Sequence, residues 1–236
     1  MGDLVEFHHD DAAESPVPVG HVLKDEFDRL WSAVQDAKGS TTIGEKRPDE
    51  PPARSHAVVR SEFPAFVDAS LEAPPINAQH AEIIQHVRDW VDGRGPCWLT
   101  IGGTRGTGKT WLACAAANAL FQARRPVVIC KFSDMIRFVQ QADKSGEYRG
   151  ISGSVAARLT RRAILDDVGA SSKTAYAADM IEEIFDWSYR QRTRLLMTTN
   201  LTAVELAAYL DGRATDRSRE IGKFMWGDWA SLRKNP

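Results

Sequence analysis

The residues with the clearest chemical meaning are Gly103–Thr110, whose sequence GTRGTGKT has the spacing G-x-x-x-x-G-K-[ST]. Glycines in such a loop let backbone N–H groups point at phosphate oxygens, and the following helix N-terminus favours negative charge. We expect Lys109 to contact the β- and γ-phosphates of a nucleotide and Thr110 to bind Mg²⁺. The predicted nucleotide-binding residues are Gly103, Thr104, Arg105, Gly106, Thr107, Gly108, Lys109, Thr110 and Trp111.

A second candidate is the pair Asp166 and Asp167, which follows the apolar run Ala163–Leu165. Ligand sites in open α/β sheets lie at the carboxyl ends of the strands, where these acids are expected. Asp166 is predicted to hold the Mg²⁺ ion and Asp167 to polarise the attacking water. The alternative, a strand ending in a solvated acidic turn, is disfavoured by the P-loop upstream.

A third polar strand end is Leu195–Asn200, sequence LLMTTN. Asn200 would be able to hold a nucleophilic water or the γ-phosphate. It would equally be able to cap the next helix, because Asn favours helix N-termini. The residues alone leave both roles open.

The elements that would position these motifs can be predicted as well. From about residue 60, short apolar runs alternate with helical patterns. This alternation predicts a parallel sheet covered by helices on both faces. Thr202 and Glu205 are spaced as a capping box. The predicted strands are 97–101, 126–132, 163–167, 194–200 and 223–226. The predicted helices are 77–92, 109–123, 133–141, one that ends at Arg162, 174–191, one after Thr202, and 213–221.

The N-terminal part differs in composition, and we predict an extension over 1–57 and an ATPase domain over 58–236. Residues 21–38 have one apolar stripe at helical spacing, and 39–57 are rich in Pro, Ser, Thr and charge. A helix on such a linker cannot bury its stripe alone. It docks on a partner protein or packs back on its own core. The stripe consists of Val22, Leu23, Phe27, Leu30, Trp31 and Val34.

Composition is that of an ordinary globular protein, with a formal net charge of -2 in 236 residues. No run reaches the roughly 18 apolar residues of a membrane span, and no signal peptide is visible. Cys97, Cys114 and Cys130 are not spaced as CxxC and are predicted to be reduced. We therefore expect a cytoplasmic protein.

Together these segments resemble the AAA+ helicase-loader family, the DnaC/DnaI/IstB-like ATPases of bacteria and their phages. The resemblance covers roughly residues 60–236 and implies a P-loop AAA+ core with a five-stranded parallel sheet and a small N-terminal helical extension. It implies that Asn200 is sensor 1 and that Arg217, with Arg213 as substitute, is an arginine finger acting on a neighbour's ATP. The segments that carry it are Ile101–Leu112, Ala163–Gly169, Leu196–Leu201, Thr215–Arg217 and, at the end, Gly227–Arg233.

Several features depart from the family pattern. Ser218 follows Arg217 where the family usually has Leu or Met, and Ser188-Tyr189 replaces its Arg-Tyr pair. The extension has no Cys cluster, so the zinc-bearing N-domain is not expected. The short chain after Asn200 accommodates two helices and a strand but no helical lid, as in these loaders.

The resemblance also implies a homo-oligomer that binds ATP, Mg²⁺, single-stranded DNA and a replicative DNA helicase, the last through residues 21–38. Basic residues interleaved with aromatics suit DNA binding, although a solvated helix face with core phenylalanines is the alternative. We predict a helicase loader; the alternatives are an IstB-like transposition ATPase, an ATP-regulated adaptor with little turnover and, from another class, a small-molecule kinase. The DNA candidates are Lys131, Phe132, Arg137, Phe138, Lys144, Tyr148 and Arg149, with a second cluster at Arg158, Arg161 and Arg162.

Overall fold

The structure is a computed structural model that describes residues 63–145, 162–170, 174–210 and 212–233. All of these belong to one compact unit, Arg47–Pro236. The predictions made for residues 1–57, including the amphipathic helix at 21–38, lie outside the described residues. Tyr148, Arg149, Arg158 and Arg161 also lie outside them.

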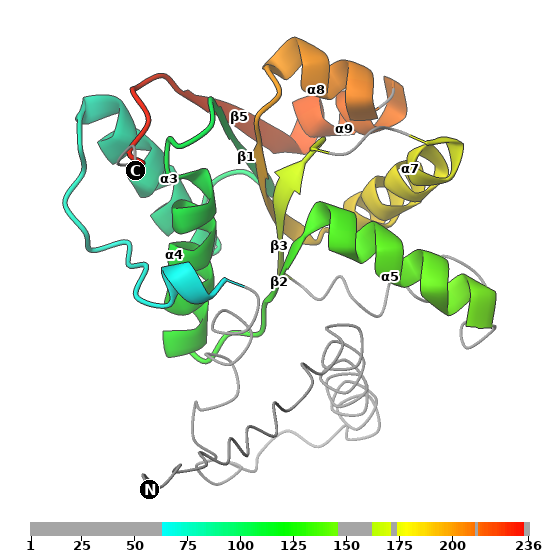
Figure 1. Cartoon of the computed structure of the whole chain (residues 1–236), viewed down its shortest axis with the longest axis horizontal. Helices are drawn as coiled ribbons and strands as arrows, with labels where there is room; N and C mark the ends of the chain where they lie inside the picture. The colour runs from blue at the N-terminus through cyan, green and yellow to red at the C-terminus, as the bar shows by residue number, and fades with distance from the viewer. Residues whose placement is uncertain (1–62, 146–161, 171–173, 211, 234–236) are drawn as a thin grey trace, which may run out of the picture. The chain divides into compact units, whose positions relative to one another are not determined.

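Five parallel strands form one sheet in the order β2-β3-β4-β1-β5, which confirms the predicted sheet (Figure 1). Side chains alternate between the two faces of each strand. The strands are β1 (Trp98–Gly103), β2 (Val128–Lys131), β3 (Arg162–Val168), β4 (Arg194–Thr199) and β5 (Gly222–Gly227).

Helices cover both faces of the sheet, as Figure 1 shows. On one face, α3 (Ala78–Val91) and α4 (Lys109–Gln122) pack on strand residues such as Ile101 and Ile164. The short 3-10 helix η2 (Pro64–Phe66) packs against α4. The other face packs residues such as Leu165 and Met197 against the remaining helices. Those helices are α5 (Phe132–Ser145), α7 (Ala175–Arg190), α8 (Ala203–Leu210) and α9 (Gly212–Ile221).

Most predicted boundaries agree with these elements to within about two residues, and their caps are as expected. Thr174 Oγ1 accepts a hydrogen bond from the Ala177 N–H at 3.2 Å. The Thr202 N–H donates to Glu205 at 2.8 Å, which confirms the capping box. Some boundaries differ from the prediction. Helix α5 begins at Phe132, whose side chain is buried, and ends at Ser145, whereas the predicted helix was 133–141. Arg162, predicted as the end of a helix, is the first residue of β3.

The described residues after β4 form α8, α9, β5 and a closing segment up to Arg233, and contain no helical lid. A search of the described residues for helices long and apolar enough to cross a membrane finds none.

On the sheet face that α7 covers, Phe185 of α7 makes an edge-to-face contact with Trp98 of β1, and their ring centroids lie 5.2 Å apart. Both side chains are fully buried. Phe185→Ala should lower the free energy of unfolding by about 3–5 kcal/mol, because it leaves a cavity beside the indole. Urea denaturation measures the change. Val204→Ala is the control, since Val204 is 80% exposed, and an equal loss in both variants would contradict this packing account.

Candidate nucleotide-binding site

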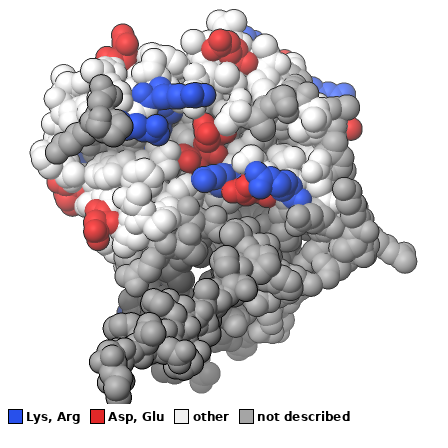
Figure 2. All heavy atoms as spheres, viewed as in Figure 1, with Lys and Arg blue, Asp and Glu red and all other residues white. Residues whose placement is uncertain are grey.

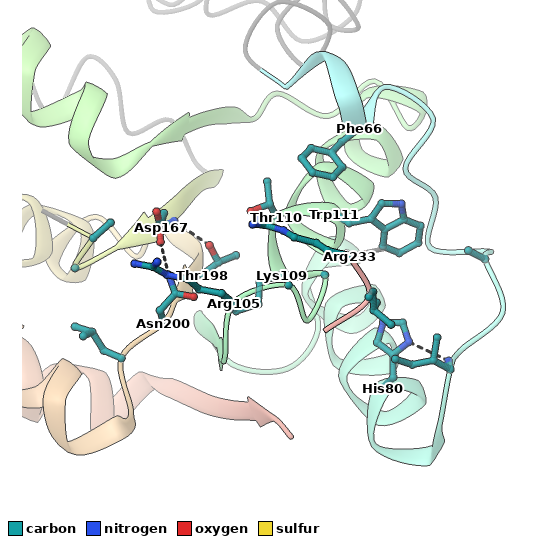
Figure 3. Close-up of a pocket in the computed structure, with 18 of the residues that line it drawn as sticks. Phe66, His80, Arg105, Lys109, Thr110, Trp111, Asp167, Thr198, Asn200 and Arg233 are labelled. Carbon is teal, nitrogen blue, oxygen red and sulfur yellow. Dashed lines mark hydrogen bonds between the residues drawn. The ribbon is translucent and has the colours of Figure 1, made fainter. Parts of the chain in front are cut away.

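A cleft of about 780 Å³ opens at the carboxyl ends of the strands. In Figure 3 the polar residues Asp167, Thr198 and Asn200 lie on one side of it and Phe66, Trp111 and His80 on the other. The space-filling view shows acidic side chains in the middle of this face with basic groups on both sides (Figure 2). The cleft thus offers a polar region and an apolar region to a single ligand.

The P-loop forms one wall because β1 ends at Gly103 and α4 begins at Lys109. Gly108, the N-cap, has φ +86°, a conformation that favours glycine. The Lys109 ammonium donates to the carbonyl oxygens of Gly103 and Thr104, each at 2.7 Å. Burial lowers the pKa of Lys109, and the neighbouring Asp167 and Asp166 oppose that shift. The predicted phosphate loop therefore has its glycines and lysine where the sequence placed them.

Asp166 is a buried carboxylate that ties three elements together. Its Oδ1 accepts a hydrogen bond from Thr198 on β4 at 2.6 Å, and its Oδ2 accepts one from Thr110 on α4 at 3.2 Å. Burial raises its pKa, and the two hydroxyl hydrogen bonds oppose the rise. A buried carboxylate with only neutral donors is costly and favours a cation nearby.

Asp167 turns into the cleft by a local distortion of β3. The pairing of β3 with β4 shifts between Leu165 and Val168, and Asp167 has φ +60°, which is rare for a residue with a side chain. Its N–H donates to Thr198 Oγ1 at 2.9 Å. Asn200 Nδ2 donates to Asp167 Oδ1 at 2.9 Å. Strained residues cluster at functional sites, so this distortion supports a chemical role for Asp167.

Thr110 and Asp166 are suited to Mg²⁺, which prefers oxygen ligands and keeps several waters. Their direct hydrogen bond shows that the hydroxyl and the carboxylate face the same point. No group of three or more His, Cys, Asp or Glu residues that would hold a metal by themselves occurs among the described residues. This donor set fits an ion shared with nucleotide phosphates better than a closed protein site.

The apolar side of the cleft comes partly from the segment before α3. His80 is buried, and its Nδ1 accepts a hydrogen bond from the Ile76 N–H at 3.2 Å. Burial lowers the pKa of His80, which favours the neutral ring that this bond requires. Phe66, Pro74 and Trp111 complete this wall. Flat apolar groups around a neutral imidazole suit an aromatic base.

The closing segment lies over the P-loop, a placement that local sequence patterns do not predict. The Trp229 indole N–H donates to the Thr107 carbonyl at 3.2 Å, and the Leu232 N–H donates to the Gly106 carbonyl at 2.8 Å. A Cβ at Gly106 would collide with Ser231. Arg233 consequently lines the cleft and lies close enough to affect Lys109 electrostatically. No site role was predicted for Arg233, because its approach depends on the path of β5.

The two arginines predicted as fingers do not line this cleft. Arg213 is exposed and pairs with Glu182 at 2.8 Å. Arg217 is half-buried, pairs with Asp186 and has its guanidinium 5.1 Å from the centre of the Tyr189 ring. Both lie on α9 and contact α7, so their predicted action on a neighbour's nucleotide stays a prediction.

The structure changes the predicted set of DNA-contacting residues. Phe132 is buried and packs with Met135, so its assignment to DNA was wrong. Lys131 is exposed, and Arg137 is exposed and pairs with Asp134 at 3.3 Å. The side chains of Phe138 and Lys144 lie outside what the structure describes.

A P-loop at the end of a central strand, a second strand with two acids and a third strand followed by Asn200 are the features of a P-loop nucleotide-binding core of the AAA+ type. A family model described as IstB-like ATP binding protein matches residues 80–216. The chain belongs to this IstB-like family. The match includes the P-loop, Asp166, Asp167 and Asn200 and ends just before Arg217.

Two curated relatives represent different branches of the resemblance. The putative insertion sequence ATP-binding protein y4uH of Sinorhizobium fredii is 31% identical over 113 residues, which are 46% of this chain and 42% of that protein. The replicative helicase loader DnaC of Escherichia coli K12 is 26% identical over 139 residues, 56% of this chain and 54% of that protein. The chain thus spans about half the length of the curated relatives it matches.

Solved structures confirm the fold. The DnaC helicase loader has a TM-score of 0.61 at 21% identity, covering 69% of this chain and 98% of that one. DnaI gives 0.57 at 20% identity, covering 72% and 93%. DnaA from Aquifex aeolicus bound to AMPPCP gives 0.57 at 20% identity, covering 67% and 50%.

We predict that the Arg233 guanidinium contacts the phosphates of a bound nucleotide. Arg233→Gln should then weaken ATP binding about tenfold or more, because a hydrogen bond between charged groups contributes about 1.5–3 kcal/mol. Titration with a fluorescent ATP analogue measures the affinity. Arg233→Lys, which keeps the charge, should lose less. Wild-type affinity in the Gln variant would contradict a phosphate contact by Arg233.

Proposed function

We propose that this chain is a DNA-associated AAA+ ATPase that loads a replicative hexameric helicase onto single-stranded DNA, with ATP hydrolysis at subunit interfaces. The observation that carries the ATPase part is the convergence of Lys109, Asp167 and Asn200 on one cleft. Asp166 lies behind it and bonds the cleft residues Thr110 and Thr198. A small-molecule kinase is disfavoured, because the described residues provide no mobile lid to close over a second substrate.

In the proposed binding mode the phosphates lie along the P-loop and the base lies against Phe66 and Trp111. Lys109 exchanges its contacts with the Gly103 and Thr104 carbonyls for phosphate oxygens. That exchange places the Lys109 ammonium beside fully charged oxygens, and this attraction offsets the free-energy cost of burying the ammonium. Thr110 and Asp166 would hold Mg²⁺, which neutralises charge on the phosphates.

Hydrolysis requires a water placed in line with the γ-phosphate. Asp167 points into the cleft and accepts a hydrogen bond from Asn200 at 2.9 Å. In our account Asp167 accepts the proton of the attacking water, and Asn200 fixes the carboxylate and the water in position. Asp166, buried behind it, stays with Thr198 and does not take the proton.

The transition state for phosphoryl transfer spreads charge over the γ-phosphate oxygens, and an added arginine speeds comparable reactions by about 10³–10⁵. Arg217 and Arg213 lie outside the cleft of their own subunit. We therefore assign the finger, first Arg217 and second Arg213, to the site of a neighbouring copy.

The partner protein is the part of the proposal for which there is a second candidate. The match to the IstB-like family and the 31% identity with an insertion sequence ATP-binding protein favour a transposition helper as the second candidate. Both functions use the same nucleotide site. They differ in whether a helicase or a transposase contacts the chain, and residues 21–38 are the proposed contact in the first.

Mixing two inactive variants tests hydrolysis between subunits. Arg217→Ala should bind ATP and turn over slowly, whereas Lys109→Ala should bind little ATP and keep its arginine. Their mixture should hydrolyse ATP faster than either alone, since some interfaces join an intact cleft to an intact arginine. Phosphate release at a concentration where the wild type is assembled is the measurement. A mixture no faster than its components would remove Arg217 from this role, and the same test of Arg213 would follow.

A further inference from the structure

Arg105 is a cationic residue of the nucleotide cleft whose side chain has no role in the binding mode proposed above. It is the third residue of the P-loop Gly103–Thr110, it is exposed, and it lines the cleft. Within the part of the chain that the structure describes, its guanidinium makes no hydrogen bond and no ion pair. Arg213 and Arg217, by contrast, each pair with a carboxylate of α7. Arg105 is therefore available to an anionic ligand in its own cleft.

The main chain is held in place on both sides of Arg105. Before it, the Thr104 carbonyl accepts a hydrogen bond from the buried Thr107 hydroxyl at 2.9 Å. After it, the Gly106 carbonyl accepts one from the Leu232 N–H at 2.8 Å. The loop thus presents an unpaired side chain from a fixed turn. A cation held in this way loses less conformational freedom when it binds a ligand.

The position of this turn indicates which phosphate Arg105 would contact. Lys109 now donates to the carbonyl of Thr104, the residue directly before Arg105. When Lys109 exchanges that carbonyl for β- and γ-phosphate oxygens, those oxygens come close to the same turn. Figure 3 shows Arg105 on the side of the cleft that holds Asp167 and Asn200. In the proposed binding mode the base lies against the opposite, apolar wall, so the terminal phosphate lies on the side of Arg105.

We propose that the Arg105 guanidinium contacts the γ-phosphate of the ATP bound to its own subunit. A guanidinium matches phosphate geometry through two parallel hydrogen bonds and stays charged at physiological pH. The contact distinguishes ATP from ADP, which lacks that phosphate. The proposal rests on the ATPase activity proposed above, to which it adds a positive charge that does not depend on a neighbouring copy.

The same contact supports the chemical step. The water oxygen forms a bond to the γ-phosphorus, and the bond between that phosphorus and the β–γ bridging oxygen breaks. The electron pair of the broken bond leaves with ADP, one water proton passes to Asp167, and the remaining hydroxyl becomes part of inorganic phosphate. Negative charge in the transition state is spread over the γ-phosphate oxygens. Arg105 would stabilise this charge in a single subunit, whereas Arg217 would add a second cation from a neighbour.

The test compares the full-length wild type with Arg105→Gln, and calorimetric titration gives the affinity for ADP and for a non-hydrolysable ATP analogue, each with Mg²⁺. The variant should bind the ATP analogue about tenfold more weakly and ADP within about twofold of the wild type. Single-turnover hydrolysis, measured at a protein concentration where the chain is monomeric, should fall about 10²-fold or more. Arg105→Lys keeps the charge and should retain part of both properties.

Arg219→Gln is the matched control, because the Arg219 side chain is 74% exposed and lies on α9. It should match the wild type in all three measurements. If Arg105→Gln binds both nucleotides as the wild type does, or loses affinity for both equally, the γ-phosphate contact is overturned. A loss of hydrolysis seen only where copies assemble would show action on a neighbour's nucleotide and reject the assignment to the same subunit.

Failure of the proposed function gives a different result. A wild type that binds ATP and does not hydrolyse it would overturn the ATPase activity, and the comparison of the two nucleotide affinities would still decide whether Arg105 contacts the γ-phosphate. A wild type that binds neither nucleotide would overturn both proposals.

Discussion

The arrangement of the site depends on one buried carboxylate, that of Asp166, which is 3% exposed. Its two hydrogen bonds, from Thr198 and Thr110, connect β3 to β4 and to the first turn of α4. Because burial raises its pKa, the ionised form is disfavoured until a cation or a further donor arrives. In the proposed function, a bound Mg²⁺ would supply that cation and would contact two of these elements, β3 and α4.

The distortion of β3 beside this carboxylate explains how two adjacent acids come to point in different directions. Asp166 continues the strand and points inward, whereas Asp167 adopts φ +60° and faces the cleft. Thr198 contacts both, since it donates to Asp166 and accepts from the Asp167 N–H. A single threonine on β4 thus contacts both the acid proposed to hold the metal and the acid proposed to activate water.

Local patterns were sufficient to predict much of this structure. The P-loop spacing, the acids after an apolar run and the Thr202–Glu205 box each depend on residues close in sequence, and their elements were predicted almost to the residue. The Phe132 error shows the limit, because an aromatic beside basic residues is equally typical of a core and of a DNA contact. The position of Arg233 depends on contacts between distant segments, such as the hydrogen bond from Trp229 to the Thr107 carbonyl. No local pattern includes them.

The central claim is that Asp167 activates water in a site that Lys109 and Asp166 assemble. It is tested most directly by comparing ATP affinity and single-turnover hydrolysis in the wild type and Asp167→Asn. The amide of the Asp167→Asn variant can still accept a hydrogen bond from Asn200 but cannot accept a proton from water. The substitution should therefore slow hydrolysis and leave ATP binding unchanged. The account predicts near wild-type ATP affinity and hydrolysis reduced about 10²-fold or more. Hydrolysis at the wild-type rate would contradict it.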